Sequence, residues 1–154
     1  MKSRSPCAWL LGSLGALLLC LVAGSSAAPM GSKTSPPAMK ITITIGERTL
    51  SASVADNATA RDFASMLPLR LTLRDYGDAE KISDLSRQLS TAEAPSAHKP
   101  EAGHIAYYAP WGNLAIFHRD FANSPGLINM GVIEGNLDAL KASGPLQATI
   151  RIAE

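Results

Sequence analysis

The chain has 154 residues with 14 basic and 13 acidic side chains, so its net charge is +1, and the basic residues are scattered. This composition excludes the basic stripe of a nucleic-acid-binding protein and the basic patch of a membrane-surface protein. The only two cysteines, Cys7 and Cys20, lie near the amino terminus, so the rest of the chain cannot form a disulfide.

Residues 1–27 have the three-part pattern of a secretory signal peptide. Lys2 and Arg4 supply a positive start, residues 8–23 form an almost uninterrupted apolar run, and small residues follow at 24–28. The apolar run is shorter than the roughly 20 residues that a membrane-spanning helix needs. We therefore predict an exported protein, periplasmic or secreted, with no membrane contact beyond the signal segment.

Local composition sets the boundaries of the predicted segments. Cleavage is expected after Ala27, because a cut one residue later would place a proline beside the scissile bond. Two alternatives stay open: lipidation at Cys20, although a bulky Leu19 precedes it, and an uncleaved anchor. Residues 28–38 are small, polar and proline-containing, which indicates a flexible linker. Residues 39–154 have the length of one domain with a single hydrophobic core.

The domain opens with a β-hairpin pattern. Residues 40–45 alternate strictly between polar and β-branched apolar side chains, Gly46 and Glu47 can form a tight turn, and residues 48–54 alternate again. Two such runs around a short turn predict antiparallel strands with one buried face.

A helix is predicted over residues 56–66. Asn57 or Thr59 can cap its amino terminus, Asp62 follows Thr59 at capping-box spacing, and Pro68 ends it. The side chains expected to face the core are Phe63, Met66 and Leu67.

The middle of the chain gives weaker signals. Residues 69–73 alternate as a strand, and residues 75–80 resemble a solvated acidic turn, because they lack the spacing of a calcium-binding loop. Residues 81–90 fit either a short strand or a helical turn. Residues 91–103 form a long polar connection with two prolines.

The segment 103–119 predicts a second hairpin with an aromatic side chain at its tip. Apolar runs at 105–108 and 114–117 flank the turn 110–113, which contains Trp111. Both faces of this strand pair are apolar, as in a barrel wall that a helix or loop covers on its outer side.

The remaining elements complete a mainly β fold. A loop at 123–126, a strand at 127–133 and a helical turn at 137–141 precede a last strand at 147–152, with Ala148, Ile150 and Ile152 on one face. Seven or eight short strands with about two short helices indicate a closed β-barrel or a sandwich, and the doubly apolar hairpin favours the barrel.

Four segments carry a family resemblance. They are residues 41–43, 85–90, 124–127 and, above all, the run 106–117 with its tyrosine–alanine–proline–tryptophan–glycine–asparagine block. With these segments the chain resembles the bacterial cyclophilin-like domain family over 39–154. The resemblance implies a cyclophilin-like barrel and no particular activity, because the family has no settled one.

Phe117, His118 and Arg119 match the signature around the catalytic arginine of true cyclophilins. The resemblance makes Arg119 and His118 candidate catalytic residues of a peptidyl-prolyl cis-trans isomerase acting on exported proteins. The glutamine- and glycine-rich segment that should follow is replaced by residues 120–123, and no later phenylalanine and tryptophan pair is recognisable. The isomerase is therefore the alternative function.

Trp111 is the main candidate for ligand binding. A tryptophan at a turn is either packed across the hairpin mouth or exposed as a binding platform. Tyr107 and Tyr108 point to opposite faces, so only one of them can share a surface with Trp111. Asn113 is expected to hydrogen-bond the turn backbone. The predicted ligand is a peptide segment or a small molecule, and the candidate binding residues are Trp111, Tyr108, Asn113, Phe117 and Arg119.

The histidines raise a metal hypothesis that the spacing does not support. If Ala109 paired with Asn113, His104 would lie opposite His118, but a third ligand is lacking and His98 lies in the long connection. Motifs for serine hydrolysis and for phosphate binding are absent from the sequence. We therefore expect no metal and no cofactor.

Overall fold

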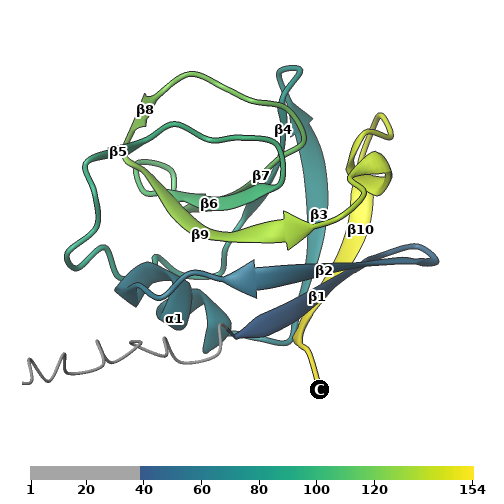
Figure 1. Ribbon diagram of the computed structural model, residues 1–154, viewed down its shortest axis with the longest axis horizontal. Coiled ribbons are helices and arrows are strands. Elements are labelled where there is room, and N and C mark those ends of the chain that lie inside the picture. Colours follow the sequence, from purple (N-terminus) through teal and green to yellow (C-terminus); the bar gives the residue numbers. More distant parts are fainter. Residues whose placement is uncertain (1–38) are drawn as a thin grey trace, which may run out of the picture. The chain divides into compact units, whose positions relative to one another are not determined.

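The computed structural model describes residues 39–154, so the predicted signal peptide (1–27) and linker (28–38) lie outside the described residues. The strands of the barrel are β1 (Lys40–Ile45), β2 (Arg48–Val54), β3 (Leu69–Tyr76), β4 (Glu80–Asp84), β6 (His104–Tyr108), β7 (Asn113–Phe117), β9 (Leu127–Glu134) and β10 (Leu146–Ile152). They close in the order β1-β10-β3-β4-β7-β6-β9-β2 (Figure 1). The predicted mainly β, closed barrel is confirmed.

The opening hairpin forms as its alternation predicts. β1 pairs antiparallel with β2, with Ile43 opposite Leu50, and β1 pairs with β10 on its other side. Ile41, Ile43 and Ala52 point into the barrel and are almost fully buried. On β10, Ala148, Ile150 and Ile152 lie on one face, as predicted. Ala148 and Ile150 are buried in this core, whereas Ile152 at the strand end is exposed.

One α-helix, α1 (Ala58–Ala64), covers one end of the barrel and is shorter than the predicted 56–66. The Asn57 side chain caps it by accepting a hydrogen bond from the Ala60 amide at 2.9 Å. Phe63 is buried in the barrel core, and Met66 and Leu67 pack against that core, as predicted.

The predicted capping box at Thr59 and Asp62 is wrong, because both side chains have tertiary partners. The Thr59 hydroxyl donates to the Ser90 carbonyl at 2.7 Å, and the Asp62 carboxylate accepts from the Ser90 amide and from the Arg87 guanidinium. These bonds tie α1 to the segment after β4. The hydrogen bonds from the Arg87 guanidinium and from the Ser90 amide hold the pKa of Asp62 at about 2.

The acidic segment 75–80 is mostly strand. β3 continues through Tyr76, the turn is confined to residues 77–79, and β4 begins at Glu80. Tyr76 pairs directly with Glu80, and Glu80 is buried, so the expected solvated turn is wrong at this residue. Of the two alternatives for 81–90, the strand is correct as far as Asp84.

Lys81 closes the barrel end opposite α1. Its side chain is 0% exposed, and its ammonium donates to the carbonyls of Ala142 at 2.6 Å and Gly144 at 3.1 Å. The ammonium also pairs with the Asp75 carboxylate at 2.5 Å. The accepting carbonyls follow the 3-10 helix η1 (Asp138–Leu140), so one lysine joins β3 and β4 to the loop that enters β10.

The long connection 91–103 is fastened to the barrel. Two of its residues form the short strand β5 (Ala97–His98), which pairs with β8 (Ser124–Pro125) in a separate two-stranded sheet.

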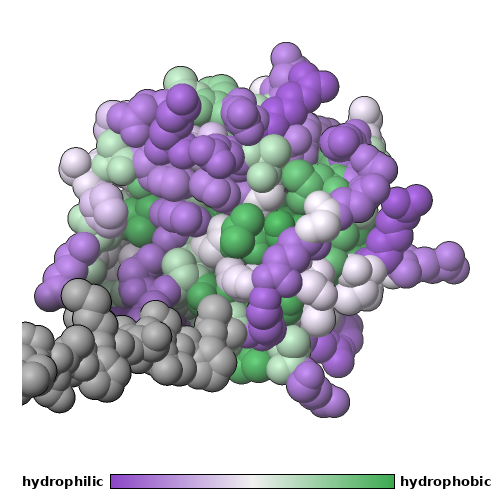
Figure 2. All heavy atoms as spheres, viewed as in Figure 1, coloured by the Kyte–Doolittle hydropathy of each residue, from purple (hydrophilic) through white to green (hydrophobic). Residues whose placement is uncertain are grey.

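Polar side chains cover most of the face shown in Figure 2, with an apolar patch over β9. Within residues 39–154, no helix has both the length and the apolar composition that crossing a bilayer requires.

Candidate functional site

The candidate site is a pocket on the outer face of β4, β7 and β6. Side chains alternate along β7, so Leu114 and Ile116 belong to the barrel core while Ala115 and Phe117 point outward. Together with Ala106, the outward side chains form a second apolar cluster. The prediction that this hairpin is buried on both faces is confirmed.

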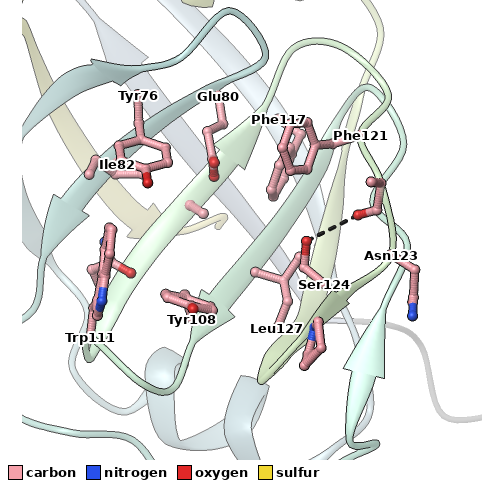
Figure 3. Close-up of a pocket in the computed structure, with 14 residues that line it drawn as sticks. Tyr76, Glu80, Ile82, Tyr108, Trp111, Phe117, Phe121, Asn123, Ser124 and Leu127 are labelled. Atoms are coloured by element: carbon pink, nitrogen blue, oxygen red, sulfur yellow. Dashed lines mark hydrogen bonds between the residues drawn. The ribbon is translucent and has the colours of Figure 1, made fainter.

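A loop following β7 covers the outer face and creates the pocket. The Phe121 amide donates to the Pro100 carbonyl at 3.0 Å, and the Gly126 amide donates to the Ser96 carbonyl at 2.9 Å, so the long connection holds this loop in place. The Ser124 hydroxyl bonds the Ala122 carbonyl at 3.0 Å (Figure 3). Between loop and sheet lies a pocket of about 400 Å³, lined by Tyr76, Glu80, Ile82, Tyr108, Trp111, Asn113, Ala115, Phe117, Phe121, Ala122, Asn123, Ser124, Pro125 and Leu127.

Trp111 stands at the rim of this pocket with 57% of its surface exposed. Its ring makes edge contacts with Tyr76, at a centroid distance of 5.5 Å, and with Tyr108, at 5.3 Å. The turn beneath it is closed by the Gly112 amide, which donates to the Tyr108 carbonyl at 2.9 Å. The indole is therefore both oriented by neighbouring rings and open to solvent, which a binding platform requires.

Tyr107 points the other way, as the alternation predicts. It is buried in the barrel core, where its hydroxyl accepts a hydrogen bond from the Leu89 amide at 3.1 Å. Only Tyr108 shares a surface with Trp111.

Glu80 is the charged group of the pocket, and sequence reasoning missed it. Its cross-strand neighbours are Tyr76 and Phe117, and its carboxylate lies between their rings and points into the pocket (Figure 3). The side chain is only 9% exposed and forms no hydrogen bond or ion pair with any residue in 39–154. Burial alone raises the pKa of Glu80 to about 7.

Asn113 contributes a second polar group without a partner. The residue is 2% exposed, and its Oδ1 atom accepts no hydrogen bond within the described part of the chain. The prediction that Asn113 bonds the turn backbone is wrong, because backbone groups close the turn and the side chain projects toward the outer face of β7. A buried amide without a partner is costly, and a bound ligand could satisfy it.

Arg119 and His118 do not join this pocket. Arg119 is exposed and is not among the lining residues. His118 lies on the opposite side of β7 from Phe117, toward Lys81 and Asp75, and its pKa is lowered by burial and then by the charges of Arg119 and Lys81. The structure thus brings together four of the five candidate binding residues (Trp111, Tyr108, Asn113 and Phe117) and leaves out both candidate catalytic residues.

The register assumed for the histidines is wrong by one residue. Tyr108, and not Ala109, pairs with Asn113, so His104 does not lie opposite His118. His104 instead stacks on His98, with ring centroids 5.1 Å apart and Nδ1 3.0 Å from Nε2 of His98. Within residues 39–154, no three His, Cys, Asp or Glu side chains lie close enough together to hold a metal ion.

The missed residues Tyr76, Glu80 and Phe121 had only weak signals. Gly77 could have indicated a tight turn between two strands, since its φ of 58° is one that glycine adopts readily. Such a hairpin would have paired Tyr76 with Glu80. Nothing in the local sequence around Phe121 indicates that the loop folds back over β7.

Glu80 by itself is expected to lower the free energy of unfolding as the pH rises from 4.5 to about 7. The pKa of Glu80 in the folded state, about 7, lies above its usual value of 4.5, so over this range the folded protein retains a proton that the unfolded chain has released. The glutamine of Glu80→Gln cannot ionise. The free energy of unfolding of this variant, measured in urea relative to that of the wild type, should therefore increase by about 2 kcal/mol between pH 4.5 and pH 8.

The exposed Glu47 provides a control for this measurement. Glu47→Gln removes a carboxylate at the β1–β2 turn and should leave the pH dependence of the wild type unchanged. If the stability difference between Glu80→Gln and the wild type were the same at pH 4.5 and pH 8, the assigned burial of Glu80 would be contradicted.

The fold and sequence have known relatives. The solution structure of a hypothetical protein from Archaeoglobus fulgidus matches with a TM-score of 0.55 and 17% sequence identity, covering 79% of this chain and 100% of that one. At this identity the likeness shows a shared fold alone. None of the curated proteins matches the chain significantly in sequence. The model of the cyclophilin-like family matches residues 43–151, and the chain therefore belongs to the cyclophilin-like family.

Proposed function

We propose that this protein is an exported binding protein whose outer pocket takes a small molecule or a side chain of a peptide segment. The observation that carries the proposal is a pocket of about 400 Å³ with five aromatic residues and two polar groups that have no partner among residues 39–154. Ligand pockets of this kind are mostly apolar and contain a few polar groups that orient the ligand. Export is proposed from the signal-peptide pattern of residues 1–27.

The pocket supports binding because its walls are already formed. Ala115 and Phe117 lie on a strand whose other face is barrel core, and the covering loop is fastened through Pro100 and Ser96. A ligand would therefore lose little affinity to ordering of the protein. Burial against the exposed ring of Trp111 would supply the apolar part of the binding free energy.

Trp111→Ala should weaken ligand binding by about tenfold, a loss of about 1.4 kcal/mol, because it removes the largest exposed ring of the pocket. Its effect on stability should be small, about 1 kcal/mol, since the lost contacts are two exposed edge interactions. Soluble neutral, cationic and anionic fragments would be titrated while backbone amide NMR signals report binding in the pocket.

Val132→Ala is the matched control, since Val132 is an exposed apolar residue of β9 outside the pocket. It should leave fragment binding unchanged. A fragment set that shifts no pocket resonance, or fragment affinities unaffected by Trp111→Ala, would refute binding at this site.

A further inference from the structure

We propose that the pocket recognises an organic cation, an alkylated ammonium or a guanidinium group, with the Glu80 carboxylate as its counter-ion. This inference rests on the proposed function and names the ligand class for the same pocket. Three observations carry it: the charge of the lining, the arrangement of the rings and the polar groups without partners.

Among residues 39–154, the pocket is lined by one acidic residue and by no basic residue. Glu80 is the only carboxylate of this part of the chain in the lining, and none of its lysines, arginines or histidines lines the pocket. The neighbouring basic side chains do not pair with Glu80. Lys81 points into the barrel, where it binds Asp75 and two backbone carbonyls, and Arg119 lies outside the pocket. A carboxylate buried without a partner is unfavourable, and a bound cation would remove that cost.

The rings around Glu80 suit a cation. Tyr76 and Phe117 flank the carboxylate, while Tyr108 and Trp111 enclose the adjacent space (Figure 3). Phe121 stands against Phe117 from the covering loop, with ring centroids 6.2 Å apart. Aromatic faces carry partial negative charge and attract cations, most strongly where water is excluded. A neutral ligand could fill the same space but would leave Glu80 without a partner, and an anion would be repelled.

Asn113 is the second and independent polar observation. Its side-chain amide is almost completely buried, lines the pocket and makes no hydrogen bond within residues 39–154. A ligand bearing N–H groups could donate to its carbonyl oxygen while pairing with Glu80. Two acceptors in one aromatic pocket therefore match an ammonium or guanidinium group.

Two sources can supply this chemistry. One is a free small amine, and the other is the lysine or arginine side chain of a polypeptide. The volume of about 400 Å³ admits either a small molecule or a single side chain. The exposed position of Trp111 leaves room for a peptide backbone to lie across the rim.

The test uses pairs of probes of equal size, one cationic and one neutral. Choline is compared with its neutral isostere 3,3-dimethylbutanol, and N-acetyl-lysine methylamide with N-acetyl-2-aminoheptanoic acid methylamide, in which a methyl group replaces the ammonium. Affinities are measured by NMR titration of the exported chain at fixed salt and at pH 8. The wild type should bind at least one cation tenfold or more tightly than its isostere, and the pair that shows this preference identifies the source.

Glu80→Gln should abolish that preference while retaining binding of the neutral probes. Glu47→Gln, which removes an exposed carboxylate elsewhere, should keep it and so control for net charge. The inference would be overturned if the wild type bound the neutral probes as tightly as the cations or more tightly. It would also be overturned if Glu80→Gln kept the preference for cations. Neither outcome would contradict the proposed function. Failure of every probe and fragment to bind would refute both. If Glu80→Gln does not fold, the comparison of isosteres on the wild type decides by itself.

Discussion

Gly131→Ala is expected to destabilise the barrel by about 3 kcal/mol or more. Gly131 lies on β9 opposite Val54 of β2, and a Cβ atom there would overlap the carbonyl oxygen of Ser53 and lie 3.3 Å from the Val54 Cα. The obstacle is backbone, so no side-chain rotation can relieve it.

The closed barrel prevents the strands from moving apart. β9 pairs with β2 on one side and with β6 on the other, where Gly131 lies opposite Ile105 at an irregularity in the register. The Gly131 amide is also bonded to the Asn129 side chain at 3.0 Å. If β9 moved away from β2 to relieve the overlap, it would therefore displace β6, which forms part of the wall of the ligand pocket.

The measurement is urea unfolding of Gly131→Ala and of Gly135→Ala as its control. Gly135 has open space around it but a φ of 93°, so its substitution should cost only the conformational strain of about 1–2 kcal/mol. If Gly131→Ala lost no more stability than Gly135→Ala, the proposed close approach of β2 and β9 would be wrong.

The second large effect is expected for Lys81→Met, which should cost about 3 kcal/mol of unfolding free energy. Methionine can fill much of the space but cannot donate to the carbonyls of Ala142 and Gly144. It would also leave the Asp75 carboxylate without its main partner, the group that lowers the pKa of Asp75 most. Asp75 is partly exposed, so most of the loss should come from the buried carbonyls.

Lys141→Met is the matched control, because Lys141 forms an exposed ion pair with Asp138 at 3.0 Å. Such a pair contributes about 0.5 kcal/mol at most. Both variants would be compared with the wild type by urea unfolding at neutral pH. Equal stability of Lys81→Met and Lys141→Met would show that Lys81 does not hold the barrel end together.

These substitutions separate two roles that one sheet combines. The inward faces of β4 and β7 hold Lys81 and Ile116, which stabilise the barrel, whereas their outward faces hold Glu80 and Phe117, which line the pocket. Adjacent residues should therefore give distinct phenotypes. Lys81→Met should affect stability first, and Glu80→Gln should affect ligand preference first.

Local sequence patterns were sufficient to predict the first hairpin, the helix and the covered wall of the barrel. Strict alternation in 40–54 predicts the opening hairpin. Asn57, as a capping residue ahead of the apolar side chain of Phe63, predicts the helix. The hairpin around Trp111, which is apolar on both faces, predicts a covered barrel wall. Each is confirmed, as is the family resemblance that the Trp111 segment carries. Alternation, capping and turn residues act within a few positions of each other, so they can be recognised without knowing what packs against them.

Which polar side chains are buried in the barrel, and which line the pocket, could be known only from the folded structure. Glu80 and Lys81 would be expected in solvent, yet β4 is inserted between β3 and β7, so one points into the pocket and the other into the barrel. A one-residue change of register separated His104 from His118, and the loop bearing Phe121 closed the pocket without Arg119. Burial and register at these positions depend on strands and loops distant along the chain, because partners across a sheet are selected by the whole barrel and not by neighbouring residues.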